Sequence, residues 1–302
     1  MKILILGARG MLGQDLVKVL SAEHELTAWD LAELDITNRE DVLGVISKLK
    51  PELVINAAAY TAVDKCETEF ELAVKINGHA VGYLAEACEA IGATLIHFST
   101  DYVFNGQKEA GYDEDEQKDP INAYGRSKAL GEDLIQEKCS KFYICRIAWL
   151  YGAGGANFVD TMLKLSKTQD MLKVVDDQIG SPTYTIDVSN KVAEIINNSY
   201  QYGIYHIPND GRVSWYEFAS EIFRQAGIDI FLVPVATAEF PRPARRPSFS
   251  VLNNNKTSKL PGWKEALARY LKRNPNANPP RRTKGQRRRE NGKLSKLSKS
   301  RA

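Results

Sequence analysis

The seven residues "GARGMLG", from Gly7 to Gly13, restrict the possible folds more than any other feature of the chain. They follow the apolar run at 2–6 directly and open a stretch in which apolar residues recur at helical spacing. The glycines at 7, 10 and 13 allow a backbone to approach a pyrophosphate, and a helix start supplies free N–H groups and a positive dipole end. The order strand, loop, helix therefore predicts a dinucleotide-binding unit, and an ordinary strand-to-helix turn is the alternative.

Apolar, β-branched runs alternate with helical patterns along the first 150 residues. Predicted strands lie in "KILILG", "ELTAWD", "ELVINAA", "ATLIHFST" and "FYICRIAWLYG", and amphipathic helices are predicted between them. This repetition predicts an α/β fold of the Rossmann type, a doubly wound parallel sheet with helices on both faces. Because ligands of such sheets bind beyond the carboxyl ends of the strands, the residues at those ends are the first candidates for function.

The pattern changes twice along the chain. Residues 1–150 are predicted to form the dinucleotide-binding Rossmann domain. Residues 151–271 are predicted to be a mixed region, dominated by a smaller C-terminal substrate-binding subdomain, with some segments returning to the Rossmann sheet. Residues 272–302 hold twelve Lys or Arg and one acid, Glu290, with almost nothing apolar. Such a basic segment cannot bury enough apolar surface to offset its ordering entropy, so we expect a disordered tail.

Composition excludes several classes of protein. No apolar run reaches the roughly 18 residues that a membrane helix needs, and the start of the chain lacks the pattern of a signal peptide. The four cysteines show no metal-ligand spacing, which indicates reduced, packed thiols and a cytoplasmic location. Outside the tail, 28 basic and 37 acidic residues leave a negative body, so binding to nucleic acid is unlikely except through the tail.

Two residues give conflicting signals about the cofactor. Asp30 closes the second predicted strand, where a carboxylate can accept from a ribose 2′-hydroxyl, which favours NAD. Arg9 lies inside the glycine loop, where a guanidinium can contact a 2′-phosphate, which favours NADP. We therefore expect use of either NADPH or NADH, and a simple strand-end cap is the alternative for Asp30.

A tyrosine and a lysine follow the fourth predicted strand. Tyr124 and Lys128, in "AYGRSK", share one helix face because they are four residues apart. Reduction of a ketone by hydride leaves an alkoxide that needs a proton, which a tyrosine hydroxyl can donate. A nearby ammonium lowers the tyrosine pKa and can hold the nicotinamide ribose. A hydroxyl from Thr100, or from Ser99, can position the carbonyl oxygen. The spacing alone is common, so the prediction depends on the glycine loop and the strand-end hydroxyls.

Several longer motifs carry a family resemblance. They are "NAAAYTAVDKCE", "STDYVFNG", "YGRSK", "RIAWLYG" and "DQIGSPTYT", and with the glycine loop they resemble the extended short-chain dehydrogenase/reductase superfamily. More narrowly the chain resembles the dTDP-4-dehydrorhamnose reductases, from residue 1 to about residue 271. This resemblance implies NAD(P)H-dependent reduction of the 4-keto group of dTDP-4-dehydro-L-rhamnose to dTDP-L-rhamnose.

The resemblance also implies roles for individual residues. Tyr124 becomes the proton donor, Lys128 its partner, and Thr100, Asp101 and Trp149 contact the sugar. The residues implied to line the cofactor are Gly10, Met11, Leu12, Asp30, Asp35, Ile36, Ala59, Tyr60 and Thr61. Asn77 matches a helix asparagine of the superfamily that supports the lysine through water, and Arg245 and Arg246 lie on the substrate side or in a solvated basic loop. A core aromatic is the alternative for Trp149, and a turn cap for Asp101.

Further properties of the family are weighed as expectations. Relatives can bind Mg²⁺ at a dimer interface, but Asp15 finds no acidic partner in the sequence, so no metal is predicted. A homodimer follows from the resemblance alone. The rival functions are another nucleotide-sugar 4-keto reductase or epimerase, and a non-catalytic subunit that keeps the cofactor. The second rival is disfavoured because Tyr124, Lys128 and Thr100 are all present.

Overall fold

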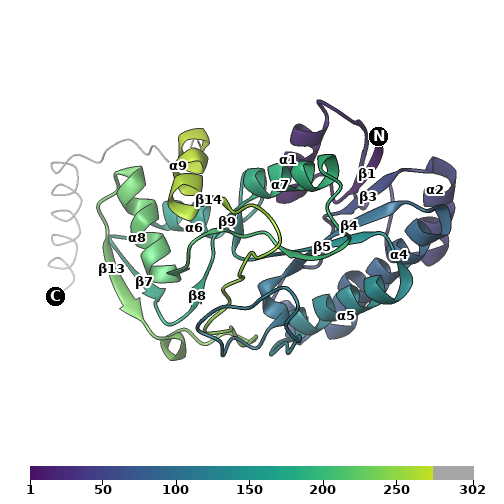
Figure 1. Ribbon diagram of the computed structural model, residues 1–302. Coiled ribbons are helices and arrows are strands. Elements are labelled where there is room, and N and C mark those ends of the chain that lie inside the picture. The colour runs from purple at the N-terminus through teal and green to yellow at the C-terminus, as the bar shows by residue number, and fades with distance from the viewer. Residues whose placement is uncertain (275–302) are drawn as a thin grey trace, which may run out of the picture.

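A computed structural model of the protein describes residues 1–274 and contains a six-stranded parallel sheet (Figure 1). Across the sheet the strands are β2 (Glu25–Trp29), β1 (Lys2–Leu6), β3 (Leu53–Asn56), β4 (Thr94–Thr100), β5 (Phe142–Ile147) and β10 (Gly203–His206). The chain runs outward from β1 to β2, then returns to build β3, β4 and β5 on the other side. A crevice for ligands is therefore expected where β1 and β3 end, and the predicted doubly wound α/β fold is confirmed.

Helices cover both faces of this sheet. Figure 1 shows α1 (Met11–Leu20) and α7 (Thr185–Asn197) above it, and α4 (Ala80–Ile91) and α5 (Ala123–Lys138) below it. The helix α2 (Arg39–Leu49) packs beside α4. The inner strands β1, β3, β4 and β5 are mostly apolar because successive side chains point to opposite faces that are both buried.

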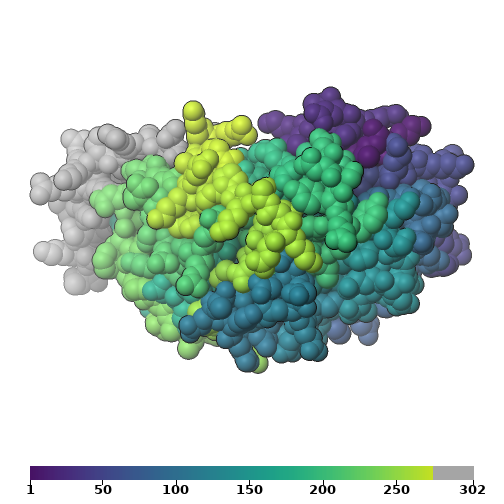
Figure 2. Space-filling model, viewed as in Figure 1, coloured from purple at the N-terminus to yellow at the C-terminus, as the bar shows by residue number. Residues whose placement is uncertain are grey.

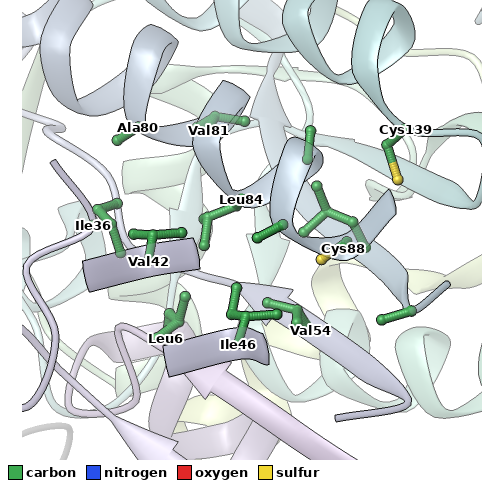
Figure 3. Close-up of a cluster of buried hydrophobic side chains, with 14 of the residues drawn as sticks. Leu6, Ile36, Val42, Ile46, Val54, Ala80, Val81, Leu84, Cys88 and Cys139 are labelled. Atoms are coloured by element: carbon green, nitrogen blue, oxygen red, sulfur yellow. The ribbon is translucent and has the colours of Figure 1, made fainter. Parts of the chain in front are cut away.

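The two faces have separate cores. Figure 3 shows Leu6 and Val54 of the sheet meeting Val42 and Ile46 of α2 and Leu84 of α4. On the opposite face, residues of β1 and β3 pack against α1 and α7 in a second cluster. Burial on both faces holds the sheet rigid, so the strand ends are fixed positions from which functional side chains can project.

The later part of the chain builds a third core beside the sheet. Its helices are α6 (Phe158–Leu165), α8 (Trp215–Ala226) and α9 (Trp263–Arg273), and its parallel pair is β7 (Met171–Val175) with β13 (Phe231–Val235). Short pairs join β6 (Leu150–Tyr151) to β9 (Thr183–Tyr184), β8 (Ile179–Gly180) to β12 (Val213–Ser214), and β11 (Asn209–Asp210) to β14 (Leu260–Gly262). Figure 2 shows the yellow end of the chain against the blue segment near residue 110, where Leu252 pairs with Tyr112.

The structure differs from the sequence expectations in three places. The strand expected in "FYICRIAWLYG" is broken, because Trp149 adopts φ +46° and separates β5 from β6. Some segment after residue 150 is expected to return to the sheet, but the sequence does not indicate β10 as the strand that does so by pairing with β5. The helix α9 includes Lys272 and Arg273, whose charges favour a helix C-terminus, so the predicted tail starts too early. Residues 275–302 of that tail lie outside the described residues, and the boundary at residue 150 stays a prediction.

Two expectations about composition can be compared with the structure. All four cysteines are free and buried, as predicted. Within residues 1–274, no helix is both long and apolar enough to cross a membrane.

Candidate active site

The glycine loop joins β1 to α1 at the predicted crevice. Gly7 has φ +74°, and a Cβ there would lie 2.6 Å from the Ala58 nitrogen. A Cβ on Gly13 would lie 2.1 Å from the Gly7 oxygen, so only glycine fits either position. Among the described residues no side chain caps α1 at Gly10, so its first N–H groups, from Met11 and Leu12 onward, are left for a ligand. This close, uncapped turn fits the pyrophosphate of a dinucleotide.

The turn after β2 brings the two cofactor signals together. Asp30 accepts hydrogen bonds from the backbone nitrogens of Arg9, at 3.0 Å, and Leu31, at 2.8 Å. The Arg9 guanidinium forms an ion pair with Glu33, which also accepts from the Asp30 nitrogen at 2.9 Å. Asp30 thus links the glycine loop to β2, as a strand-end cap would, and each of its oxygens keeps a lone pair for a ribose hydroxyl.

The other predicted cofactor residues lie on two neighbouring loops. Asp35 accepts from the nitrogen and the hydroxyl of Thr37, which hold the pKa of its carboxyl below the usual range. Ile36 turns inward and is buried with the α2 core, whereas Asp35 is exposed. After β3, Ala59 and Thr61 are exposed and Tyr60 is half-buried.

Asn77 lies in a π-helical segment (Lys75–His79) between α3 (Phe70–Val74) and α4. Its amide accepts from the Tyr60 nitrogen at 2.8 Å and donates to the Tyr60 oxygen at 2.9 Å and to Ser127 Oγ at 3.0 Å. Asn77 therefore ties the loop after β3 to α5. A role toward Lys128 through water stays a prediction.

The predicted proton donor and its neighbours meet at the end of β4. Thr100 donates to Asp101 Oδ1 at 2.8 Å. The same hydroxyl is near enough to Tyr124 to lower the pKa of its phenol. Asp101 is 3% exposed, and burial raises the pKa of its carboxyl to about 6, against the hydroxyls of Ser250 and Thr100, which lower it. Thr100 also caps the short turn that follows by accepting from the Tyr102 nitrogen. The structure therefore places Thr100, Asp101 and Tyr124 in one cluster.

Lys128 is buried one helical turn after Tyr124 on α5. Its Nζ lies 2.6 Å from the Phe98 oxygen and 3.0 Å from His97 Nε2. Burial lowers the pKa of Lys128 to about 7, although the carboxylate of Glu132 acts in the opposite direction. His97 is equally buried, and burial holds its pKa well below the usual value, with Lys128 as the second cause.

The expected electrostatic effect of Lys128 on Tyr124 is not found. Burial, and then the charge of Asp101, raise the pKa of Tyr124 well above 10, and the Thr100 hydroxyl lowers it. Lys128 is not among the causes of this shift, and its Nζ is bound to groups of β4. A raised pKa keeps Tyr124 protonated at neutral pH, which is the state that a proton donor needs.

Trp149 follows β5 at the same edge of the sheet. Its ring stacks on Trp215 with centroids 3.5 Å apart and planes 6° apart. A Cβ on Gly180 would lie 2.4 Å from its Cε2, so the ring is held between β8 and α8. The structure thus places Trp149 as a packed aromatic with a strained backbone, and stacking on a sugar stays a prediction.

The arginine loop lies against the start of α5. Asn122 caps that helix by accepting from the Gly125 nitrogen at 2.7 Å, and it donates to the Arg245 oxygen at 2.8 Å. Arg246 forms an ion pair with Asp64 at 2.9 Å, whereas the Arg245 side chain is exposed. The cap therefore fixes both the direction of the Tyr124 face and the position of the loop.

Sequence reasoning gave no role to two residues of the site, Asn56 and His97. His97 contacts Lys128, and its Nδ1 lies 3.1 Å from the Asn56 amide nitrogen. Both are polar side chains in otherwise apolar strands, and this was the signal available in the sequence. A polar residue in a doubly covered strand needs a partner, because leaving it unpaired costs free energy.

Comparisons with known proteins agree with this geometry. The family model for the RmlD substrate binding domain matches residues 1–275. The spore coat polysaccharide biosynthesis protein SpsK of Bacillus subtilis is 42% identical, with 89% of this chain and 96% of that protein covered. A dTDP-4-dehydrorhamnose reductase of Aggregatibacter actinomycetemcomitans is 43% identical, with 88% and 97% covered.

A solved structure extends the similarity to three dimensions. The dTDP-4-dehydrorhamnose reductase of Bacillus anthracis, solved in complex with NADP, is 41% identical. It superposes with a TM-score of 0.88 over 90% of this chain and 99% of that one. With its glycine loop and the Thr100–Tyr124–Lys128 cluster in place, the chain belongs to the RmlD substrate-binding-domain family.

Proposed function

We propose that this protein reduces the 4-keto group of dTDP-4-dehydro-L-rhamnose with NADPH or NADH, forming dTDP-L-rhamnose, the last step of its biosynthesis. The observation that supports it most is the cluster of Thr100, Asp101 and Tyr124 at the carboxyl end of β4, at the same end of the parallel sheet as the glycine loop. The names of the relatives support the choice of sugar.

The cofactor supplies a hydride when it is bound. Its pyrophosphate would be held by the first N–H groups of α1 and its adenosine ribose by Asp30. The Thr100 hydroxyl would bind the substrate carbonyl oxygen. Tyr124, protonated at neutral pH, would donate its proton to that oxygen as the alkoxide forms.

A panel of nucleotide-4-keto-sugars tests the proposal. The purified protein is mixed with each sugar, and oxidation of NADPH and of NADH is followed by absorbance. We expect turnover with dTDP-4-dehydro-L-rhamnose above all others. Turnover of a different sugar only would assign the rival reductase or epimerase function, and no turnover with any sugar would assign the non-catalytic function.

The proposed substrate is a small nucleotide-sugar, with no membrane or nucleic-acid partner. The homodimer and the cytoplasmic location remain expectations from the sequence, and equilibrium sedimentation would test the first of them.

A further inference from the structure

The buried end of Lys128 has unusual surroundings for a lysine. The residue is 2% exposed, and its Nζ contacts only the Phe98 oxygen and the His97 ring among the groups that the structure describes. No carboxylate within residues 1–274 lies within ion-pair distance of that nitrogen. An ammonium without a counter-ion is costly to bury, so the protonation state of Lys128 requires an explanation.

Asn56 determines where the proton of His97 lies. The two residues face each other across β3 and β4, and both are 1% exposed. The backbone nitrogen of Ala58 can only donate, and it lies 3.1 Å from Asn56 Oδ1. The amide nitrogen of Asn56 must then face His97 Nδ1, at 3.1 Å, and donate to it. A neutral imidazole that accepts at Nδ1 carries its proton on Nε2.

That proton points at Lys128. His97 Nε2 lies 3.0 Å from Nζ, so its N–H needs an acceptor there. An ammonium has three donors and no lone pair, whereas a neutral amine can accept from His97 and still donate to the Phe98 oxygen. We infer that Asn56 and His97 are positioning residues that hold Lys128 as an uncharged amine in the cofactor-free enzyme.

The other charged groups near Lys128 agree with this state. Glu132 is one turn further along α5, but both of its oxygens are bound by Arg146, at 2.9 and 2.7 Å. Lys118 Nζ lies 3.5 Å from the same carboxylate. The positive charges of Arg146 and Lys118 offset much of the effect of Glu132 on Lys128, and Tyr124, on the same helix, is neutral. The lowered pKa values of Lys128 and His97 have the direction that this arrangement requires.

The arrangement links Lys128 to the cofactor loop. To charge Lys128, His97 must offer a lone pair at Nε2 and move its proton to Nδ1. The Asn56 amide would then have to turn its oxygen toward His97, which breaks the bond to the Ala58 nitrogen. Ala58 belongs to the loop that Gly7 contacts closely. The inference deepens the proposed function, because it concerns the same site, but its first test requires no turnover.

The first test is the tautomer of His97 in the cofactor-free protein. Nitrogen-15 NMR of histidine-labelled protein separates the two neutral tautomers and the imidazolium, with signals assigned through His97→Gln and His206→Gln. We expect His97 to carry its proton on Nε2 at pH 7.5. His206 is an internal reference of opposite kind, because its Nδ1 faces the Asn253 oxygen and its Nε2 faces Arg146. A proton on Nδ1 of His97, or an imidazolium, would overturn the inference.

The second test uses Asn56→Asp and the pH dependence of kcat/KM, which reports the free enzyme. A carboxylate accepts from His97 Nδ1, so it should move the ring proton to Nδ1 and let Nε2 accept from a charged Lys128. Because a charged Lys128 is expected to hold the nicotinamide ribose, kcat/KM of the wild type should fall as pH rises through about 7. In Asn56→Asp this fall should lie at least one pH unit higher. Gln136→Glu adds the same charge on the exposed surface of α5 and should leave that limb in place.

An unmoved limb in folded Asn56→Asp, verified by circular dichroism, would contradict the role of Asn56. If this variant does not fold, the tautomer of His97 in the wild-type protein, measured by NMR, decides whether the inference holds. If no sugar is turned over, the NMR result still tests the inference, so its failure and that of the proposed function are distinguishable.

Discussion

Tyr124 lies one helical turn before Lys128, next to the hydroxyl of Thr100 at the end of β4. This position, and a pKa raised through burial and the charge of Asp101, support the proposed role of the tyrosine as proton donor. The lysine, in contrast, is bound to β4 and does not assist in lowering that pKa in the cofactor-free structure. The pKa values of Tyr124 and Lys128 are therefore shifted by different neighbours and in opposite directions.

Removing the Tyr124 hydroxyl tests its role. In Tyr124→Phe, kcat should fall by about 10²–10⁴-fold, because the alkoxide loses its proton donor. The affinity for NAD(P)H, measured by fluorescence titration, should change little. Tyr143 lies near the amino end of β5, away from the carboxyl ends of the strands, and its hydroxyl donates to the Tyr200 oxygen. The control variant Tyr143→Phe should therefore keep the activity of the wild type. Near wild-type turnover in Tyr124→Phe would refute the assignment.

The burial of Asp101 predicts a pH-dependent stability. Its pKa is raised from 3.8 to about 6 on folding, so the folded state binds more protons between these values and loses stability as pH rises through them. Asp101→Asn should therefore be more stable than wild type at pH 7.5, by about 2–3 kcal/mol, and no more stable at pH 3.5. Chemical denaturation at both pH values measures this difference, and an equal gain at both would contradict the prediction.

Sequence reasoning found the site residues that lie close to one another along the chain. Tyr124 and Lys128 share a helix face, and the glycines share a turn, so spacing reveals them. His97 and Lys128 are 31 residues apart and come from a strand and a helix. No spacing rule connects them, and only the packing of α5 on β4 brings them together. Trp149 likewise stacks on Trp215, which lies 66 positions later in the chain, and spacing does not reveal this contact either.

At the scale of elements, the βα unit at the start of the chain depends on glycine. Gly7→Ala should destabilise the protein by at least about 1–3 kcal/mol, because φ +74° is strained for alanine and its Cβ would meet the backbone of Ala58. Gly44→Ala, in the middle of α2 with open space around it, should instead stabilise by about 0.5–1 kcal/mol. Thermal unfolding of the two variants, with NAD(P)H affinity, compares them. A harmless Gly7→Ala would contradict the proposed turn.

The strands of the first 150 residues could be predicted because each is a continuous apolar run between helical patterns. The strand β10 is a four-residue segment, "GIYH", that follows a turn and precedes "IPNDG". Its place at the sheet edge depends on pairing with β5, far away in the sequence. The break at Trp149 likewise comes from tertiary packing, since nothing in "RIAWLYG" marks a residue with positive φ.

Across the whole molecule, a buried polar network joins the sheet, α5 and the loop around Asn253. Arg146 of β5 binds Glu132 of α5 and faces His206 of β10, whose Nδ1 faces the Asn253 oxygen. Arg146 and Glu132 are at most 1% exposed. The network thus holds the later chain against the sheet edge that carries the site.

Breaking this network at one side should be costly. Glu132→Gln leaves Arg146 as an uncompensated buried charge, so we expect a loss of about 3–5 kcal/mol of unfolding free energy. The double variant Glu132→Leu/Arg146→Met removes both charges and should recover much of the lost unfolding free energy. Urea denaturation of both variants measures the difference. A single variant as stable as wild type would show that the pair does not hold the two parts together.

The most direct test of the proposed function follows the transferred hydrogen. The protein is incubated with dTDP-4-dehydro-L-rhamnose and NADPH or NADH deuterated at the reactive C4 of the nicotinamide, and the product is analysed by NMR and mass spectrometry. We predict dTDP-L-rhamnose with one deuterium at C4 of the sugar, and almost none of this product from Tyr124→Phe. Unlabelled sugar, or deuterium at another carbon, would contradict the account.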